Sequence, residues 1–117
     1  MSLEYLLDPT ELDIGINYPG GLLRAVDQGL VNLTPWHIMQ RDLAKKRFQG
    51  VRQRYRVMYV PFARRQDNDD LACFDPARPQ RIFIIHDFAP EGAQEYREFP
   101  SFWDWFRSAV EDMMEFD

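Results

Sequence analysis

A histidine followed by an aspartate, His86-Asp87, is the residue pair in this sequence best suited to hydrolytic chemistry. Metal-dependent hydrolases hold one or two metal ions with two or more histidines and several carboxylates. The only other histidine is His37, and the pair directly follows the apolar run Ile82 to Ile85, which is typical of a strand end. We therefore predict no metal site and no cofactor. A small hydrolase centred on His86 and Asp87 is kept as an alternative.

The single cysteine, Cys73, is the only candidate thiol nucleophile. It lies between Ala72 and Phe74 in an apolar segment, where burial disfavours the thiolate that such catalysis requires. One cysteine also forms no internal disulfide and cannot hold a structural zinc ion alone, which fits the reducing cytoplasm. The sequence contains no phosphate-binding glycine loop, dinucleotide-binding glycine pattern or nucleophile elbow. We therefore predict a cytoplasmic protein that is not an enzyme.

An acidic segment contains Asp67, Asp69 and Asp70. A calcium-binding loop of the EF-hand type needs an oxygen ligand, a glycine and a glutamate at its fifth, sixth and twelfth positions. Counted from Asp67, those positions hold Leu71, Ala72 and Arg78. Because the loop motif is absent, we expect the three aspartates to lie together on an exposed turn. There they either contact a partner or hold the turn by local hydrogen bonds.

The net charge of −5 hides a strong asymmetry along the chain. Between Arg41 and Arg65 there are nine basic residues and one acidic residue, a net charge of +8, so the rest of the chain carries −13. Phe48 and Tyr55 are interleaved with the basic residues, a pattern that could neutralise phosphates and stack on bases. A nucleic-acid-binding module using residues 41–65 is therefore an alternative. The acidic balance of the whole chain argues against nucleic acid as the partner.

The length of 117 residues predicts one domain, residues 1–117. No apolar run approaches the roughly 20 residues of a membrane span, so no membrane partner is expected. Apolar spacing predicts a helix over residues 21–28, capped at Gly29, and a second helix over residues 40–48 that stops at Gly50. Residues 31–38 contain Thr34-Pro35, which suits either a helix cap or a short extended edge segment.

From Tyr55 onward the apolar pattern changes to that of strands, which we expect over residues 56–61, 71–74 and 82–86. The short connections between them favour antiparallel neighbours. Residues 82–85 are all apolar, so this strand should be central and covered on both faces. Helices must then flank the sheet. The fold class is α+β, an antiparallel sheet with helices around it.

The last segment predicts a docked C-terminal helix. Ser101 followed by Asp104 is a capping pair, in which the hydroxyl accepts from a free amide of the first turn. An apolar stripe follows at spacings of three and four residues: Phe102, Trp105, Phe106, Ala109, Val110, Met113 and Phe116. Such a stripe should pack against the core.

The segment from Pro61 to Asp75 resembles the central motif of the SUKH superfamily. A strand ends in Val60-Pro61-Phe62, the turn carries Asp69-Asp70, and a second strand resumes as Cys73-Phe74-Asp75. Aromatic residues near the C-terminus are also similar to the family pattern: Phe99, Phe102, Trp103, Trp105 and Phe106. The resemblance implies a single α+β domain that binds a protein partner. Many bacterial members are immunity proteins that neutralise a cognate toxin, often a nuclease.

This resemblance makes a cognate protein toxin the expected partner. An acidic inhibitor suits a target with a basic groove, so we expect the acidic side to bind and the residues 41–65 to face away or pair internally. Exposed Trp36, Trp103 or Tyr96 would serve as an anchor at the centre of the contact. The partner-binding candidates are Asp67, Asp69, Asp70, Trp36, Arg64, Arg65 and Trp103.

Overall fold

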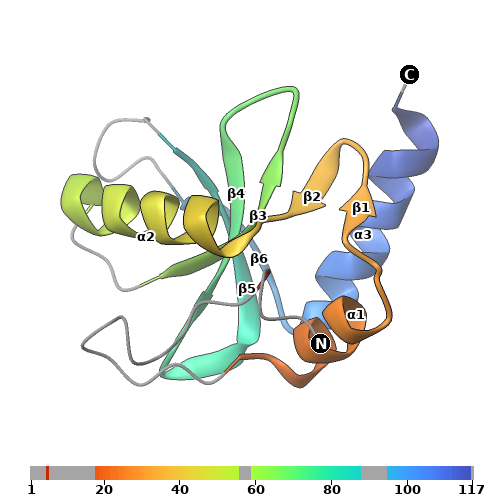
Figure 1. The fold of residues 1–117 in the computed structure, drawn as a ribbon, viewed down its shortest axis with the longest axis horizontal. Helices are drawn as coiled ribbons and strands as arrows, with labels where there is room; N and C mark the ends of the chain where they lie inside the picture. Colours follow the sequence, from red (N-terminus) through yellow and green to blue (C-terminus); the bar gives the residue numbers. More distant parts are fainter. Residues whose placement is uncertain (1–4, 6–17, 56–58, 88–94, 117) are drawn as a thin grey trace.

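The chain forms one six-stranded antiparallel sheet with helices on both faces (Figure 1). The computed structural model describes residues 5, 18–55, 59–87 and 95–116, without the side chains of residues 95 and 96. In chain order the elements are α1 (Gly20–Asp27), β1 (Asn32–Leu33), β2 (Trp36–Ile38), α2 (Arg41–Tyr55), β3 (Val60–Arg65), β4 (Asp70–Asp75), β5 (Arg78–His86), β6 (Glu95–Phe99) and α3 (Phe102–Glu115). The predicted α+β fold is confirmed.

The strands follow one another in space in their chain order, and each pairs with its neighbour in antiparallel register. The strands predicted over residues 71–74 and 82–86 lie within β4 and β5. The strand predicted over residues 56–61 is misplaced, because β3 runs from Val60 to Arg65; residues 56–58 lie outside the described part of the chain. Residues 82–85 are buried on both faces of the sheet, as expected.

Three of the strands were not predicted. Residues 31–38, which the sequence left open, form the short strands β1 and β2 joined at Thr34-Pro35. The third, β6, has the sequence EYREF, which is mostly charged and lacks the regular alternation of apolar and polar residues that is typical of a strand. It lies at the edge of the sheet and pairs only with β5 among the described strands. Its conformation therefore depends on hydrogen bonds to β5, a partner from a different part of the chain.

The first helix ends as its sequence predicts. Gly29 has a positive φ of 75°, and its N–H donates to the Val26 carbonyl at 3.0 Å. The Leu30 N–H donates to the Ala25 carbonyl at 2.8 Å, which completes the hydrogen-bond pair of a Schellman motif. Gly29 is suited to this position because it has no Cβ to hinder the left-handed conformation.

The second helix is longer than predicted, because it continues through Gly50 to Tyr55. A glycine inside a helix costs about 0.5–1 kcal/mol relative to alanine. Val51 and Tyr55 are buried beyond it, and burying a large apolar side chain gains about 1.5–3 kcal/mol. Burial therefore outweighs the local preference to stop. A Cβ at residue 50 would lie 2.9 Å from Nη1 of Arg54, so the glycine also leaves room for that guanidinium.

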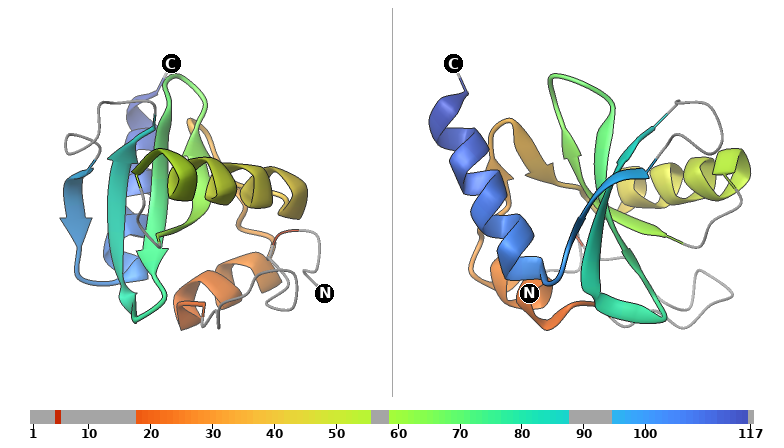
Figure 2. Two further views of the ribbon diagram at one scale, coloured as in Figure 1. Left: turned by 90° about the vertical axis from the view of Figure 1, so that its left-hand side faces the viewer. Right: turned by 180° about the vertical axis from the view of Figure 1, so that it is seen from behind.

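The helices α2 and α3 cover opposite faces of the sheet, and α1 lies beside α3 (Figure 2). Ser101 Oγ accepts a hydrogen bond from the Asp104 N–H at 3.1 Å, which confirms the predicted cap of α3. Phe102, Trp105 and Ala109 are buried, so the helix is docked. The buried stripe is shorter than predicted, since Met113 is 38% exposed. This position lies in the last turn of α3.

The charge asymmetry of the sequence becomes an asymmetry between the two faces of the sheet. The helix α2 contains six basic residues and one acidic residue, a net charge of +5. The helix α3 contains four acidic residues and one basic residue, a net charge of −3. Because the two helices lie on opposite faces, a charged partner meets very different potentials on the two sides.

Candidate functional site

His86 and Asp87 contact different partners, which lie on β4 and α2 respectively. His86 Nδ1 lies 2.6 Å from Asp70 Oδ1, and these two residues are register partners in β5 and β4. The Asp87 carboxylate is fully buried and binds α2 instead, through Arg47 Nη1 at 3.0 Å and Arg54 Nε at 3.0 Å. Neighbouring residues in the sequence therefore do not form one joint site. Within the described ranges, no three histidine, cysteine, aspartate or glutamate side chains are placed to hold a metal ion.

Cys73 lies inside the sheet and is fully buried. Desolvation by burial, together with the nearby charge of Asp87, raises the pKa of the Cys73 thiol well above its ordinary value of 9.0. Both effects oppose formation of the thiolate. The surroundings of Cys73 are therefore those of a core residue, as the sequence indicates.

The three aspartates of the acidic segment have different environments. Asp67 and Asp69 are exposed on the turn between β3 and β4. Asp70 is only 5% exposed and is held by His86, so the expectation that all three lie on an exposed turn is wrong for this residue. Asn68 supplies the local turn hydrogen bond, because its Oδ1 accepts from the Asp70 N–H at 2.8 Å. Two of the three carboxylates thus face solvent.

Asp112 on α3 joins the helix to the sheet, although it is not among the residues predicted from the sequence. Its Oδ2 accepts from Trp36 Nε1 at 3.0 Å and from Arg65 Nη1 at 3.4 Å. Arg65 Nε also donates to Asp67 Oδ1 at 2.8 Å, and its guanidinium lies 6.0 Å from the centre of the Trp36 ring. No sequence signal pairs residues this far apart in the chain. One arginine therefore connects the β3–β4 turn with α3.

The electrostatics of Arg65 reflect these partners. Burial alone would lower the pKa of the Arg65 guanidinium. The hydrogen bond to Asp67 and the charges of Asp67, Asp112 and Asp70 outweigh burial and raise that pKa above its ordinary value. Arg65 is therefore a fixed positive charge that neutralises part of the acidity around it.

The two predicted tryptophan anchors differ in exposure. Trp36 is 3% exposed, because its ring packs edge-to-face on Trp105 at 5.6 Å and its N–H binds Asp112. The expectation that Trp36 is exposed is therefore wrong. Trp103 is 42% exposed and touches the rings of Phe102 and Phe106.

Arg64 is half-buried on β3, at the register position facing His37 of β2. It lies next to Arg65 at the end of β3 that leads into the β3–β4 turn.

We use the term acidic end for five carboxylates on the β3–β4 turn and the C-terminal half of α3. They are Asp67, Asp69, Glu111, Asp112 and Glu115. The turn and the C-terminal end of α3 lie at the same end of the molecule in every view (Figures 1 and 2). Four of the five carboxylates are exposed, and Asp112 is partly buried. Arg65 holds Asp67 and Asp112 together across this end.

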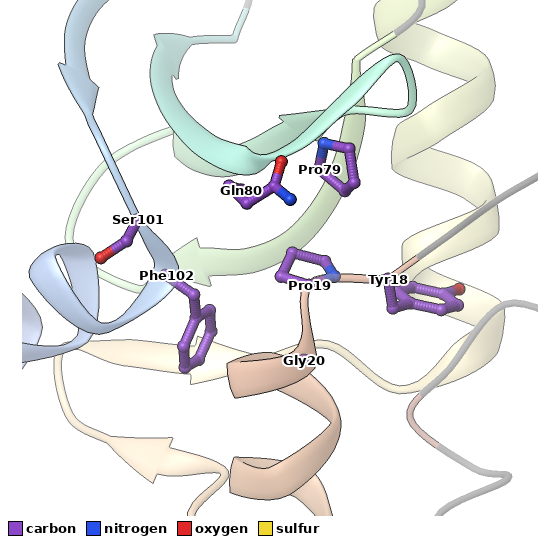
Figure 3. A pocket seen from close by; sticks show the side chains of 7 residues that line it. All are labelled: Tyr18, Pro19, Gly20, Pro79, Gln80, Ser101 and Phe102. Carbon is purple, nitrogen blue, oxygen red and sulfur yellow. The ribbon is translucent and has the colours of Figure 1, made fainter.

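Two of the hollows among the described residues lie away from the acidic end. One, of about 320 Å³, is lined on α2 by Leu43, Lys46, Arg47, Gly50 and Arg54. The other, of about 140 Å³, lies where the start of α1, the start of β5 and the start of α3 meet (Figure 3). Its lining is mainly apolar: Tyr18, Pro19, Gly20, Pro79, Gln80, Ser101 and Phe102. Neither hollow contains His86 or Cys73.

A scan against protein-family models, a search of curated proteins and a search of solved structures each found no match. In the described part of the chain, none of the helices has the length and apolar character of a membrane span.

Proposed function

We propose that this chain is an immunity protein that binds a cognate bacterial toxin and neutralises it by covering a surface of that toxin. The observation that carries the proposal is the acidic end, where exposed carboxylates lie on two elements that Arg65 joins through Asp67 and Asp112. Charged groups fixed in this way suit recognition of a complementary protein surface. The resemblance of residues 61–75 to the SUKH motif supports the same function.

The surroundings of the reactive side chains support binding over catalysis. Asp87 is enclosed by two arginines. Cys73 is buried, and burial disfavours its thiolate form. His86 is engaged with Asp70. An inhibitor needs none of these groups to react, whereas a hydrolase would need at least one of them in a shared site.

Co-expression tests the proposal. The gene directly upstream of the one encoding this chain should encode a protein that stops bacterial growth, and this chain should restore growth. The two purified proteins should elute together from a sizing column in a fixed ratio. If growth is not restored and no complex forms, the chain is not the immunity protein of that gene product.

A second candidate is nucleic-acid binding through α2, favoured by the net charge of +5 on that helix. Lys46, Gln49 and Arg52 are exposed on it and could contact phosphates. This function predicts binding of oligonucleotides that weakens steeply with salt and with the double substitution Lys46→Gln/Arg52→Gln. Binding that is absent at about 50 mM salt would remove this candidate.

A further inference from the structure

We propose that the toxin docks on the acidic end of this chain, with the side chain of Met114 inserted into an apolar recess within a basic surface of the toxin. This inference rests on the proposed function and adds to it the face that binds and the chemistry of the partner.

The C-terminal half of α3 presents apolar surface among carboxylates. Met114 is 71% exposed, more than any other large apolar side chain in the described part of the chain, and Met113 beside it is 38% exposed. Glu111 and Glu115 flank Met114 at distances of three residues and one residue along the helix. Methionine is flexible and polarisable, and it is common at surfaces that adapt to a partner. This half of the helix therefore combines an anchor with a charged rim.

The acidic end is held in position before any partner arrives. Asp112 accepts hydrogen bonds from Trp36 and Arg65, and Arg65 also binds Asp67. Trp36 itself is buried against Trp105 of the same helix. The β3–β4 turn and α3 are thus joined by hydrogen bonds within the free protein, which reduces the conformational entropy lost on binding.

Charge selects both the partner and its orientation. The four exposed carboxylates of the acidic end attract a basic surface, whereas α2, with its net charge of +5, repels one. The two lie on different sides of the molecule (Figure 2). A basic toxin surface therefore approaches through α3 and the β3–β4 turn. A polyanion such as nucleic acid is repelled from the same end.

The test measures association with the product of the upstream gene by stopped flow at about 50 and 500 mM salt. Glu111→Gln/Glu115→Gln removes two exposed charges from the acidic end, and Lys46→Gln/Arg52→Gln removes two exposed charges from α2 as the matched control. We expect the first variant to associate about tenfold more slowly at low salt and to lose part of the salt dependence. The control should associate at the wild-type rate or faster.

The anchor is tested by the dissociation rate. Met114→Ala should raise it at least about tenfold, as loss of a central anchor does. Leu23→Ala is the matched control, because Leu23 is also apolar and 43% exposed but lies on α1. All four variants change exposed side chains, so their urea unfolding curves should match the wild type within about 0.5 kcal/mol.

The outcomes separate this inference from the proposed function. If the wild-type chain neutralises the toxin but both acidic-end variants bind as tightly as it does, the docking face is wrong and the function stands. Weaker binding by Lys46→Gln/Arg52→Gln would place the partner on α2 and also overturn the inference. If the wild-type chain neither binds nor neutralises, the proposed function itself fails.

Discussion

Replacing Trp105 by alanine should lower the free energy of unfolding by about 3–5 kcal/mol. The side chain is 1% exposed and lies where α3 meets the sheet. Its ring contacts Phe62 at 5.0 Å, Phe102 at 5.5 Å and Trp36 at 5.6 Å between centroids. Alanine would leave a cavity between these rings, and each lost aromatic pair adds about 0.5–1.5 kcal/mol beyond burial. The upper half of the range is therefore expected.

Urea unfolding followed by far-ultraviolet circular dichroism measures the loss, because tryptophan fluorescence changes with the substitution itself. Trp103→Ala is the matched control on the same helix, and at 42% exposure its loss should stay below about 1 kcal/mol. Domains are stable by about 5–15 kcal/mol, so Trp105→Phe provides a milder change if the alanine variant does not fold. A loss below about 1 kcal/mol for Trp105→Ala, or equal losses for both tryptophans, would refute the docking of α3 described above.

Two further predictions concern α2 and the sheet core. Gly50→Ala should lower stability although it improves helix propensity by about 0.5–1 kcal/mol, because the new methyl displaces the Arg54 guanidinium from Asp87. In an Arg54→Ala background, Gly50→Ala should stabilise the protein. Urea unfolding of the wild type, the two single variants and the double variant measures both effects. If Gly50→Ala stabilises the protein in both backgrounds, displacement of Arg54 is not the cause. Cys73 should resist thiol reagents at pH 8 until urea unfolds the chain, because burial and the charge of Asp87 raise its pKa. The folded state then keeps a proton that the unfolded chain loses as the pH rises past the ordinary thiol pKa of 9.0, so stability should fall over that range, and Cys73→Ala should reduce the fall. If the stability of the wild type and of Cys73→Ala falls equally with pH, the Cys73 thiol is not the cause of the fall.

The sequence alone was sufficient where local forces decide the structure. The cap at Ser101, the stripe of α3 from Phe102 to Ala109 and the Gly29 end of α1 depend on residues within one or two turns, and all three are present. The continuous apolar run of residues 82–85 was likewise enough to predict a strand buried on both faces. The antiparallel arrangement followed from the short connections. These features need no knowledge of distant partners.

Long-range contacts decided the remaining features. Burial of Val51 and Tyr55 carries α2 through a glycine that should end it, and pairing with β5 makes a strand of the charged segment β6. Such contacts outweigh local propensity because each large buried side chain gains more than a single residue's preference costs.

The candidate site shows the same division. The sequence located the carboxylates of the β3–β4 turn and the asymmetry of charge, because both follow from residue order alone. It placed Trp36 on the surface and left Asp112 unnoticed, since their hydrogen bond spans 76 residues and exists only once α3 lies on the sheet. It also treated His86 and Asp87 as one pair, whereas the fold gives each its own partner from β4 or α2. Residue types and spacing are local properties of the chain, while burial and charge pairing depend on which segments the tertiary structure brings together.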